Sequence, residues 1–146
     1  MTAIDPHRLV LAAYPVAREV TARVSDMDGY GHLNAIRIGH FYEDARAAFY
    51  GVAFAGLHRA RTPVAQLTIR YLGEGFWPGT MTIGTGMLKV GVSSYVMGQG
   101  LFQDGRCIGL CDTVLVSTEN GRAHRLPDDI RAAAEVMKLR LSNPAE

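Results

Sequence analysis

Hydrophobic residues alternate with polar ones in several stretches of this chain. In residues 16–25, Val20, Ala22 and Val24 fall on one face, and charged or hydroxyl side chains fall on the other, as in a half-buried strand. The same period of two recurs at residues 64–72, and residues 81–90, 93–102 and 106–117 are further strand candidates, bounded by Gly91 and by the pair Asp104-Gly105. We therefore predict five strands, the last four of which follow one another without an intervening helix.

One stretch follows the helical period instead. From residue 35 the apolar side chains recur at spacings of three and four, at Ile38, Phe41, Tyr42, Ala45, Ala48, Phe49 and Val52. Asn34 precedes them and is a favoured N-cap residue, so the helix is predicted to begin there and to end near Gly51 or Gly56. Glu43 and Arg46 lie three residues apart on the predicted helix surface, where they could form an ion pair.

Helix signals also stand near the two ends of the chain. Asp5, followed by a proline, predicts a capped turn within residues 1–13. Pro127 is followed by two aspartates, which favours a second helix over residues 127–141. The last residues, 142–146, are predicted to form a frayed tail.

The order of these elements predicts an α+β fold, in which a five-stranded antiparallel sheet curls around one long helix. Asp104 and Gly105 mark a tight hairpin between the last two strands. The chain has 146 residues, 48% hydrophobic and 20% charged, which suits a single domain spanning residues 1–146. Its net charge of +1 gives no reason to expect nucleic acid as a partner, and no signal peptide or membrane span is evident, so we expect no membrane partner.

Candidate chemistry concentrates where the first strand gives way to the long helix. The first turn of a helix exposes unpaired N–H groups and the positive end of the helix dipole, which together stabilise a negative oxygen. Asp28 is ionised at neutral pH, so it could attack an acyl carbon or act as a general base toward water. Gly31 lacks a side chain, which lets a ligand approach the backbone closely. Asp26 is interpreted first as a turn carboxylate and second as a catalytic group.

The run D-x-D-x-x-G-H-x-N, followed by a helix that carries E-D-A-R, resembles the 4-hydroxybenzoyl-CoA thioesterase-like branch of the hot-dog fold, the acyl-CoA thioesterases. The matching residues are Asp26, Asp28, Gly31, His32, Asn34, Glu43, Asp44, Ala45 and Arg46. Many members have a second Asn where Ala35 stands and a Tyr where Ile38 stands. Ala35 lacks that polar side chain, but it keeps the backbone N–H that an oxyanion hole needs.

The resemblance implies hydrolysis of an acyl-CoA or acyl carrier protein thioester to a free acid and a thiol. It implies that Asp28 is the catalytic carboxylate and that backbone N–H groups at the helix start, Ala35 first, polarise the thioester carbonyl. It also implies that His32 and Asn34 orient water or substrate. Without the resemblance, His32 would be interpreted as a turn residue and Asn34 as a cap alone. A cap uses the side-chain oxygen and leaves the NH₂ free, so both roles of Asn34 can coexist.

Two further segments are candidates for contacts with coenzyme A. A family hairpin that binds the pantetheine and phosphate portion matches the segment carrying Lys89, Ser93 and Ser94, although serine at a strand start is also ordinary turn chemistry. The loop with Arg59 and Arg61 could meet phosphates; a solvated basic loop is the interpretation we favour. Coenzyme A enters as part of the substrate, and no other cofactor and no metal are expected.

Three reactive or charged residues fall in the last predicted strand. Cys107 and Cys111 lie four residues apart on one predicted face and roughly 13 Å apart, too far for a disulfide, and core packing is favoured over a nucleophile role. Two reduced thiols suit a cytoplasmic protein. Asp112 shares its predicted face with apolar residues, so we expect an ion pair with Arg70 or Arg106 in preference to a second site carboxylate.

Glycines inside the predicted strands cost stability, so they imply that a neighbouring group occupies the space a side chain would fill. They stand at Gly84, Gly86, Gly98, Gly100 and Gly109. A helix packed against a curved sheet would need that space, and so would an acyl tunnel; sheet curvature is the explanation we favour.

Unpaired sheet edges imply self-association. Hot-dog thioesterases form homodimers with sites at the subunit boundary, and tetramers are common, so we expect a homodimer or homotetramer. Each site would take Asp28 from one chain and coenzyme contacts from the other. Two rival functions stay open: a hot-dog hydratase or dehydratase acting on acyl-CoA, and a non-catalytic acyl-CoA-binding protein.

Overall fold

The protein folds around one five-stranded antiparallel sheet, with strand order β1-β3-β4-β5-β2. The structure is a computed structural model that describes residues 2–58 and 60–141; the predicted tail 142–146 and Arg59 lie outside the described residues. The strands are β1 (Val16–Thr21), β2 (Val64–Tyr71), β3 (Thr80–Val90), β4 (Ser94–Gln103) and β5 (Arg106–Val116). A short ribbon of β6 (Thr118–Glu119) and β7 (Arg122–Ala123) follows.

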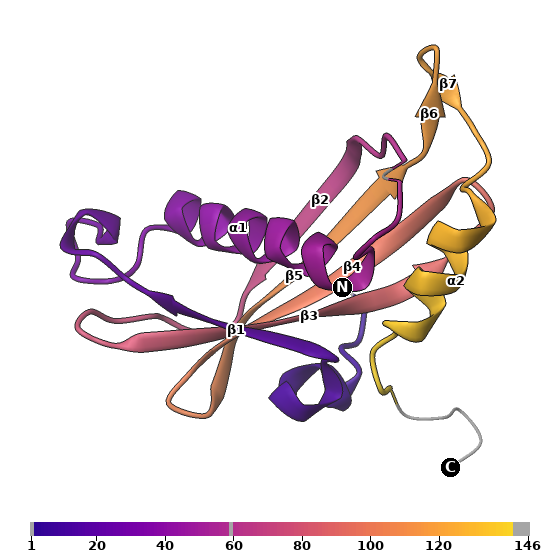
Figure 1. The fold of residues 1–146 in the computed structure, drawn as a ribbon. Helices are drawn as coiled ribbons and strands as arrows, with labels where there is room; N and C mark the ends of the chain where they lie inside the picture. Colours follow the sequence, from indigo (N-terminus) through magenta and orange to yellow (C-terminus); the bar gives the residue numbers. More distant parts are fainter. Residues whose placement is uncertain (1, 59, 142–146) are drawn as a thin grey trace.

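The long helix α1 (Ala35–Ala53) packs on one face of this sheet (Figure 1). Asn34 caps it, because its side-chain oxygen accepts from the N–H groups of Ile36 at 2.8 Å and Arg37 at 3.4 Å. Tyr42 and Phe49 are fully buried against the sheet. The predicted α+β fold, a long helix wrapped by a curved five-stranded sheet, is therefore confirmed, including the helix start.

The second helix, α2 (Asp128–Val136), is shorter than predicted. The backbone after it leaves the helix because Met87 of β3 donates its N–H to Met137 O at 2.8 Å and accepts from Leu139 N at 2.9 Å. Two short 3₁₀ turns, η1 (Pro6–Leu9) and η2 (Leu11–Ala13), precede β1, and Asp5 caps the first.

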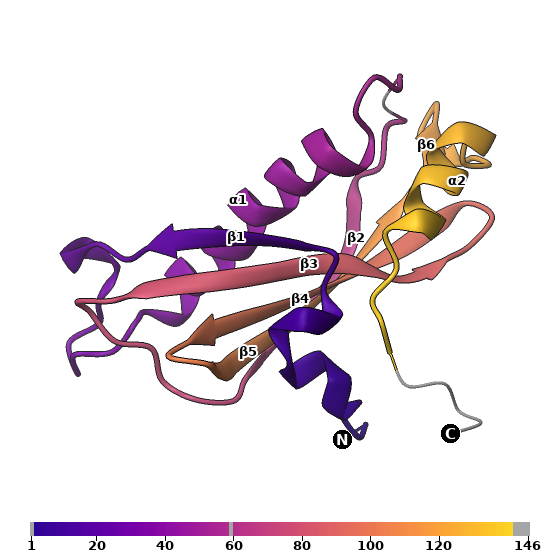
Figure 2. The same ribbon diagram turned by 60° about the horizontal axis from the view of Figure 1, so that its bottom comes forward.

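The strand glycines make room for the segment before β1. A Cβ on Gly84 would lie 2.5 Å from the ring of Tyr14, and one on Gly100 would lie 2.7 Å from its hydroxyl. Figure 2 shows this N-terminal segment on the side of the sheet away from α1. Only Gly109 approaches the helix, because a Cβ there would lie 2.7 Å from the hydroxyl of Tyr42. Neither an acyl tunnel nor packing of α1 therefore explains Gly84 and Gly100.

The first strand ends earlier than its alternation predicts. β1 stops at Thr21, and the residues that were predicted to end the strand form a 3₁₀ turn, η3 (Val24–Asp26). The Asp26 carboxylate accepts from Arg23 N at 2.7 Å, which closes the chain into this turn. Val24 consequently turns outward and is 63% exposed, so its predicted place on the buried face was wrong.

A β-bulge in β5 separates the two cysteines, both of which are free. Leu101 pairs with Gly109 but Phe102 pairs with Cys107, which leaves one extra residue in β5. Cys111 lies in the core beneath α1, whereas Cys107 packs beside Phe102 in a different cluster. The prediction that the cysteines share a face was wrong, because a bulge breaks the period of two.

Asp112 does form the predicted structural ion pair, but with a different partner. Its carboxylate lies 2.6 Å from the guanidinium of Arg8, in the first 3₁₀ turn. The predicted partners, Arg70 and Arg106, were wrong, because the N-terminal segment that carries Arg8 crosses this face of the sheet. Arg8 is buried there and ties the segment to β5.

Candidate functional site

A compact turn at residues 26–34 joins η3 to α1 and carries most of the predicted site. Met27 and Leu33 form an antiparallel bridge across it. Asp28 N donates to His32 O at 2.7 Å, and Asn34 N donates to Asp26 O at 2.8 Å. The turn is thus fastened at both ends, which fixes its side chains relative to the first turn of α1.

Asp28 lies inside this turn as a hydrogen-bond acceptor. Its Oδ1 accepts from His32 N at 3.0 Å and from Tyr30 N at 2.8 Å. These two hydrogen bonds stabilise the charged form and so hold the pKa of Asp28 below its ordinary value. The bond from His32 contributes most. Its Oδ2 has no hydrogen-bond partner among the described residues. One oxygen therefore anchors an ionised carboxylate, and the other is available to a ligand.

The first helical N–H group of α1 is available too. The Asn34 cap satisfies Ile36 and Arg37 and leaves Ala35 N–H without a hydrogen-bond partner within residues 2–58 and 60–141. Ala35 is exposed, and the helix dipole reinforces the partial positive charge on its N–H. The hydroxyl of Tyr71, at the end of β2, donates to Ala35 O at 3.1 Å and ties the edge strand to the helix start.

His32 meets a loop that no pattern in the sequence assigned to the site. Its Nε2 lies 3.1 Å from a carboxylate oxygen of Glu74, and its ring stands edge-on to Phe76 with centroids 5.4 Å apart. Gln103 holds this loop by accepting from Phe76 N and donating to Phe76 O, both at 2.9 Å. The sequence did not indicate Glu74, because it lies more than 40 residues from His32 in the chain. The available signal was a His in a turn without a partner nearby in the sequence.

The other carboxylate of the motif, Asp26, is a structural group. It is 7% exposed, accepts from Arg23 N at 2.7 Å and lies 4.0 Å from the guanidinium of Arg37. Its hydrogen bond closes η3 immediately before the 26–34 turn. This agrees with the favoured interpretation of Asp26 as a turn carboxylate.

The predicted coenzyme contacts lie at the opposite end of the sheet. Lys89 and Ser94 flank the β3–β4 hairpin, while β3 begins at Thr80 opposite Thr21, close to the 26–34 turn. The 11 residues of β3 span roughly 33 Å. Ser93 is in the same hairpin and accepts at its carbonyl from Ser117 N. A single chain therefore does not bring Lys89, Ser93 and Ser94 to Asp28.

The sequence profile of the thioesterase-like superfamily matches residues 22–134, which include the 26–34 turn, α1 and all of β2 to β5. The chain belongs to this superfamily. Among curated proteins, none matches this chain significantly.

Several solved structures share the fold of this thioesterase-like chain. A thioesterase from Thermus thermophilus, complexed with coenzyme A and Zn, is 27% identical, with a TM-score of 0.75 over 83% of this chain and 98% of that chain. The PA2801 protein from Pseudomonas aeruginosa is 28% identical, with a TM-score of 0.70 over 80% of this chain and 95% of that one. A predicted thioesterase from Bacillus stearothermophilus is 24% identical, with a TM-score of 0.75 over 84% and 95% of the two chains.

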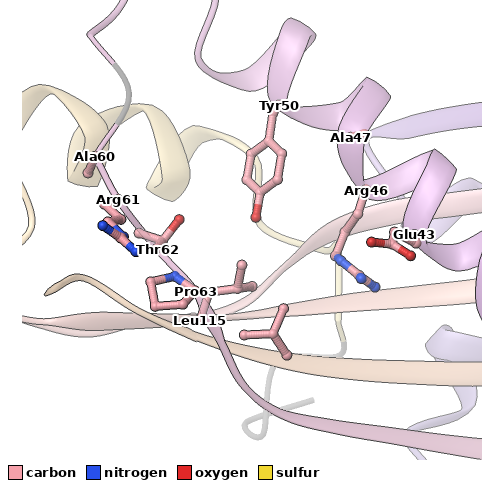
Figure 3. A pocket seen from close by; sticks show the side chains of 10 residues that line it. Glu43, Arg46, Ala47, Tyr50, Ala60, Arg61, Thr62, Pro63 and Leu115 are labelled. Atoms are coloured by element: carbon pink, nitrogen blue, oxygen red, sulfur yellow. The ribbon is translucent and has the colours of Figure 1, made fainter. Parts of the chain in front are cut away.

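A second feature of this thioesterase-like chain is a cavity of about 460 Å³ between the C-terminal half of α1 and the start of β2 (Figure 3). We call it the Arg46 cavity; its lining includes Glu43, Arg46, Tyr50, Arg61, Thr62 and Leu115. Arg46 is buried, so its predicted place on the helix surface was wrong, and it forms no ion pair with Glu43. The signal in the sequence was a charge on the same helix face as Tyr42 and Phe49.

Two further observations concern metal ions and membrane-spanning helices. Within residues 2–58 and 60–141, no three His, Cys, Asp or Glu side chains are grouped so that they could hold a metal ion. Neither helix of this described part is long and apolar enough to cross a bilayer.

Proposed function

We propose that this thioesterase-like protein hydrolyses an acyl thioester of coenzyme A or acyl carrier protein to a free acid and a thiol. One observation carries the proposal: a single strand-turn-helix unit presents an ionised carboxylate, that of Asp28, and a helix-start N–H, that of Ala35, which has no partner among the described residues. Membership of the thioesterase-like superfamily agrees with this chemistry. The coenzyme A complex of the Thermus thermophilus relative supports coenzyme A as the thiol carrier.

The proposed mechanism begins with the thioester carbonyl accepting a hydrogen bond from Ala35 N–H. The negative oxygen of the tetrahedral intermediate is then stabilised by that donor and by the helix dipole. Asp28 acts in one of two ways. It attacks the acyl carbon, expels the thiolate and forms an anhydride that water hydrolyses, or it takes a proton from the water that attacks. Both routes consume one water and release acid and thiol.

Neighbouring residues supply orientation in this mechanism. Asn34 caps the helix with its oxygen, and its free NH₂ can donate to water or substrate. His32 belongs to the same turn as Asp28, and its ring is held beside Glu74. Gly31 adopts a φ of +83° and carries no side chain, which leaves room for a ligand over the turn.

We also propose that the active form is a homodimer, or a tetramer built from such dimers. Most of the edge strand β2 is exposed, and Leu67 and Tyr71 are 47% and 51% exposed although they share the α1 side of the sheet with Ile69. A second copy would cover this apolar row. Contacts from Lys89, Ser93 and Ser94 to coenzyme A would then come from the chain opposite Asp28. Both cysteines are free, which supports a reducing compartment such as the cytoplasm.

Leu67→Lys is expected to convert the dimer to a monomer, because a charge in the apolar row would have to be buried without a partner. Sedimentation velocity measures the change. Val10→Lys is the matched control, since Val10 is 53% exposed but lies between η1 and η2, in the N-terminal segment on the opposite face of the sheet. A Leu67→Lys protein that stays dimeric would place the interface elsewhere.

A panel of acyl-CoA thioesters, with free thiol as the readout, tests the proposed activity. We expect thiol release from at least one saturated acyl-CoA. Hydration of enoyl-CoA without thiol release would select the hydratase. Tight acyl-CoA binding with no turnover over hours would select the non-catalytic binding protein.

A further inference from the structure

A buried cation lines the Arg46 cavity. Arg46 is 8% exposed, and its Nη1 donates to Thr113 Oγ1 at 3.3 Å. A guanidinium carries five N–H donors, and across the described ranges the Arg46 side chain makes no other hydrogen bond and no ion pair. Figure 3 shows the Arg46 side chain pointing from α1 into the cavity, on the same side as Tyr50.

Such a cation calls for an anion. Arginine stays charged at any physiological pH, and a buried charge is normally paired. Glu43 lies on the preceding turn of α1 but is exposed and forms no ion pair with Arg46, so it does not supply that anion in this structure. The other polar side chains of the lining are those of Arg61, Thr62 and Tyr50, none of them an anion. Arg46 is therefore a buried cation beside a cavity, without an ion-pair partner among the described residues.

We propose that the Arg46 cavity binds a carboxylate at the far end of the acyl group, so that the preferred substrates are thioesters of dicarboxylic acids. This inference rests on the proposed function and names the substrate class of that activity. The volume of about 460 Å³ lies within the range of small-molecule sites. Leu115 and Pro63 line the cavity as well and give the methylene groups of such a chain apolar contacts.

The charge balance favours a carboxylate over a phosphate. A planar guanidinium binds carboxylate and phosphate oxygens alike through two parallel hydrogen bonds, so charge separates the two ligands. Glu43 and Arg61 are both exposed and opposite in charge, and solvent screens both. Arg46, the buried cation of the lining, is balanced by a single negative charge, which a phosphate exceeds at neutral pH. The cavity is thus suited to a monoanionic group.

The dimer proposed above would bring the Arg46 cavity of one chain toward the 26–34 turn of the other. Within one chain, Ala35 and Arg46 are roughly 16 Å apart along α1, a long reach for a short acyl group. Antiparallel pairing of two β2 strands about a two-fold axis places the start of one strand opposite the end of the other. The end of β2 is tied to the helix start through Tyr71. An acyl group bound at one helix start would then extend toward the Arg46 cavity of the second copy.

Isothermal titration calorimetry with free acids tests the inference without any turnover. Hexanoate is compared with hexanamide, and octanoate with octanamide, because each pair differs in the negative charge that the cavity is proposed to bind. We expect at least one acid to bind more than about tenfold tighter than its amide, and Arg46→Gln to abolish that preference. Glu43→Gln should strengthen binding of the acid, because it removes a competing negative charge. Arg18→Gln, on the exposed side of β1, is the control and should change nothing.

Three results would overturn the inference. They are equal binding of each acid and its amide by the unmodified protein, weaker acid binding by Glu43→Gln, and tighter binding of inorganic phosphate than of hexanoate. The first and third need no variant, so a failure of Arg46→Gln to fold leaves the test intact. A preference for hexanoate over hexanamide in a protein that releases thiol from no thioester would keep the carboxylate site and reject the hydrolase. Thiol release without preference for adipoyl-CoA over heptanoyl-CoA would do the reverse.

Discussion

Asp28→Asn is expected to lower thiol release from acyl-CoA by about 10² to 10⁴-fold while the fold is retained. An amide oxygen can still accept from His32 N and Tyr30 N, so the 26–34 turn keeps both of its hydrogen bonds. The amide can neither attack the acyl carbon nor take a proton from water. The measurement is the rate of free thiol formation at saturating substrate, with circular dichroism as the check on folding.

This experiment needs two precautions that follow from the sequence. An asparagine at position 28 would be followed directly by Gly29, and Asn-Gly pairs deamidate to aspartate, so fresh protein and a second variant, Asp28→Ala, are required. Asp104→Asn is the matched control, because Asp104 sits in the β4–β5 hairpin at a φ of +51°, where Asn is a favoured residue. Asp28→Asn and Asp28→Ala proteins that are folded and release thiol at the normal rate would remove Asp28 from the mechanism.

Ala35→Pro is expected to lower turnover by about 10² to 10³-fold, the usual loss when one oxyanion donor is removed. Proline is well tolerated at the first position of a helix, where its missing N–H is not used by the helix. Asn34 has a φ of −65° and a ψ of 134°, an extended conformation that suits the residue before a proline. The substitution therefore deletes one backbone N–H and leaves helix and cap in place.

Turnover and thermal unfolding should be measured together for Ala35→Pro. The control is Ala35→Gly, which alters the same position but keeps the N–H, and its turnover should stay close to normal. A proline variant with unchanged melting temperature and unchanged turnover would show that another donor holds the carbonyl oxygen. Unchanged substrate KM with reduced kcat would be the signature of a group used mainly in the transition state.

The sequence was informative about the site wherever the controlling interactions are local. Asn34 and its two acceptor bonds span three residues, and the Asp28 bonds to Tyr30 and His32 span four. Residue type and short spacing are enough to indicate such features. The same holds for the Asp104-Gly105 hairpin, where two residues with positive φ form the turn.

Prediction failed where a distant segment or a break in periodicity intervened. The alternation rule placed Cys107 and Cys111 together, and a single extra residue in β5 reversed one of them. Asp112 was expected to find a cation nearby, but its partner Arg8 is more than 100 residues away in the chain. A helical spacing of three indicated a Glu43–Arg46 pair without revealing that Arg46 is buried.

By itself, the sequence determined the long capped helix, the five strands and the position of Asp28 in the turn before that helix, whereas the order β1-β3-β4-β5-β2 in the sheet came from the structure. These depend on hydrogen bonds between near neighbours and on a repeating pattern of burial. Only the tertiary structure decided that Glu74 lies beside His32, that Tyr14 fills the space over Gly84 and that Arg46 is buried beside a cavity without an ion-pair partner among the described residues. The physical reason is that packing brings together groups from separate elements, and which charges are matched emerges only when those elements meet.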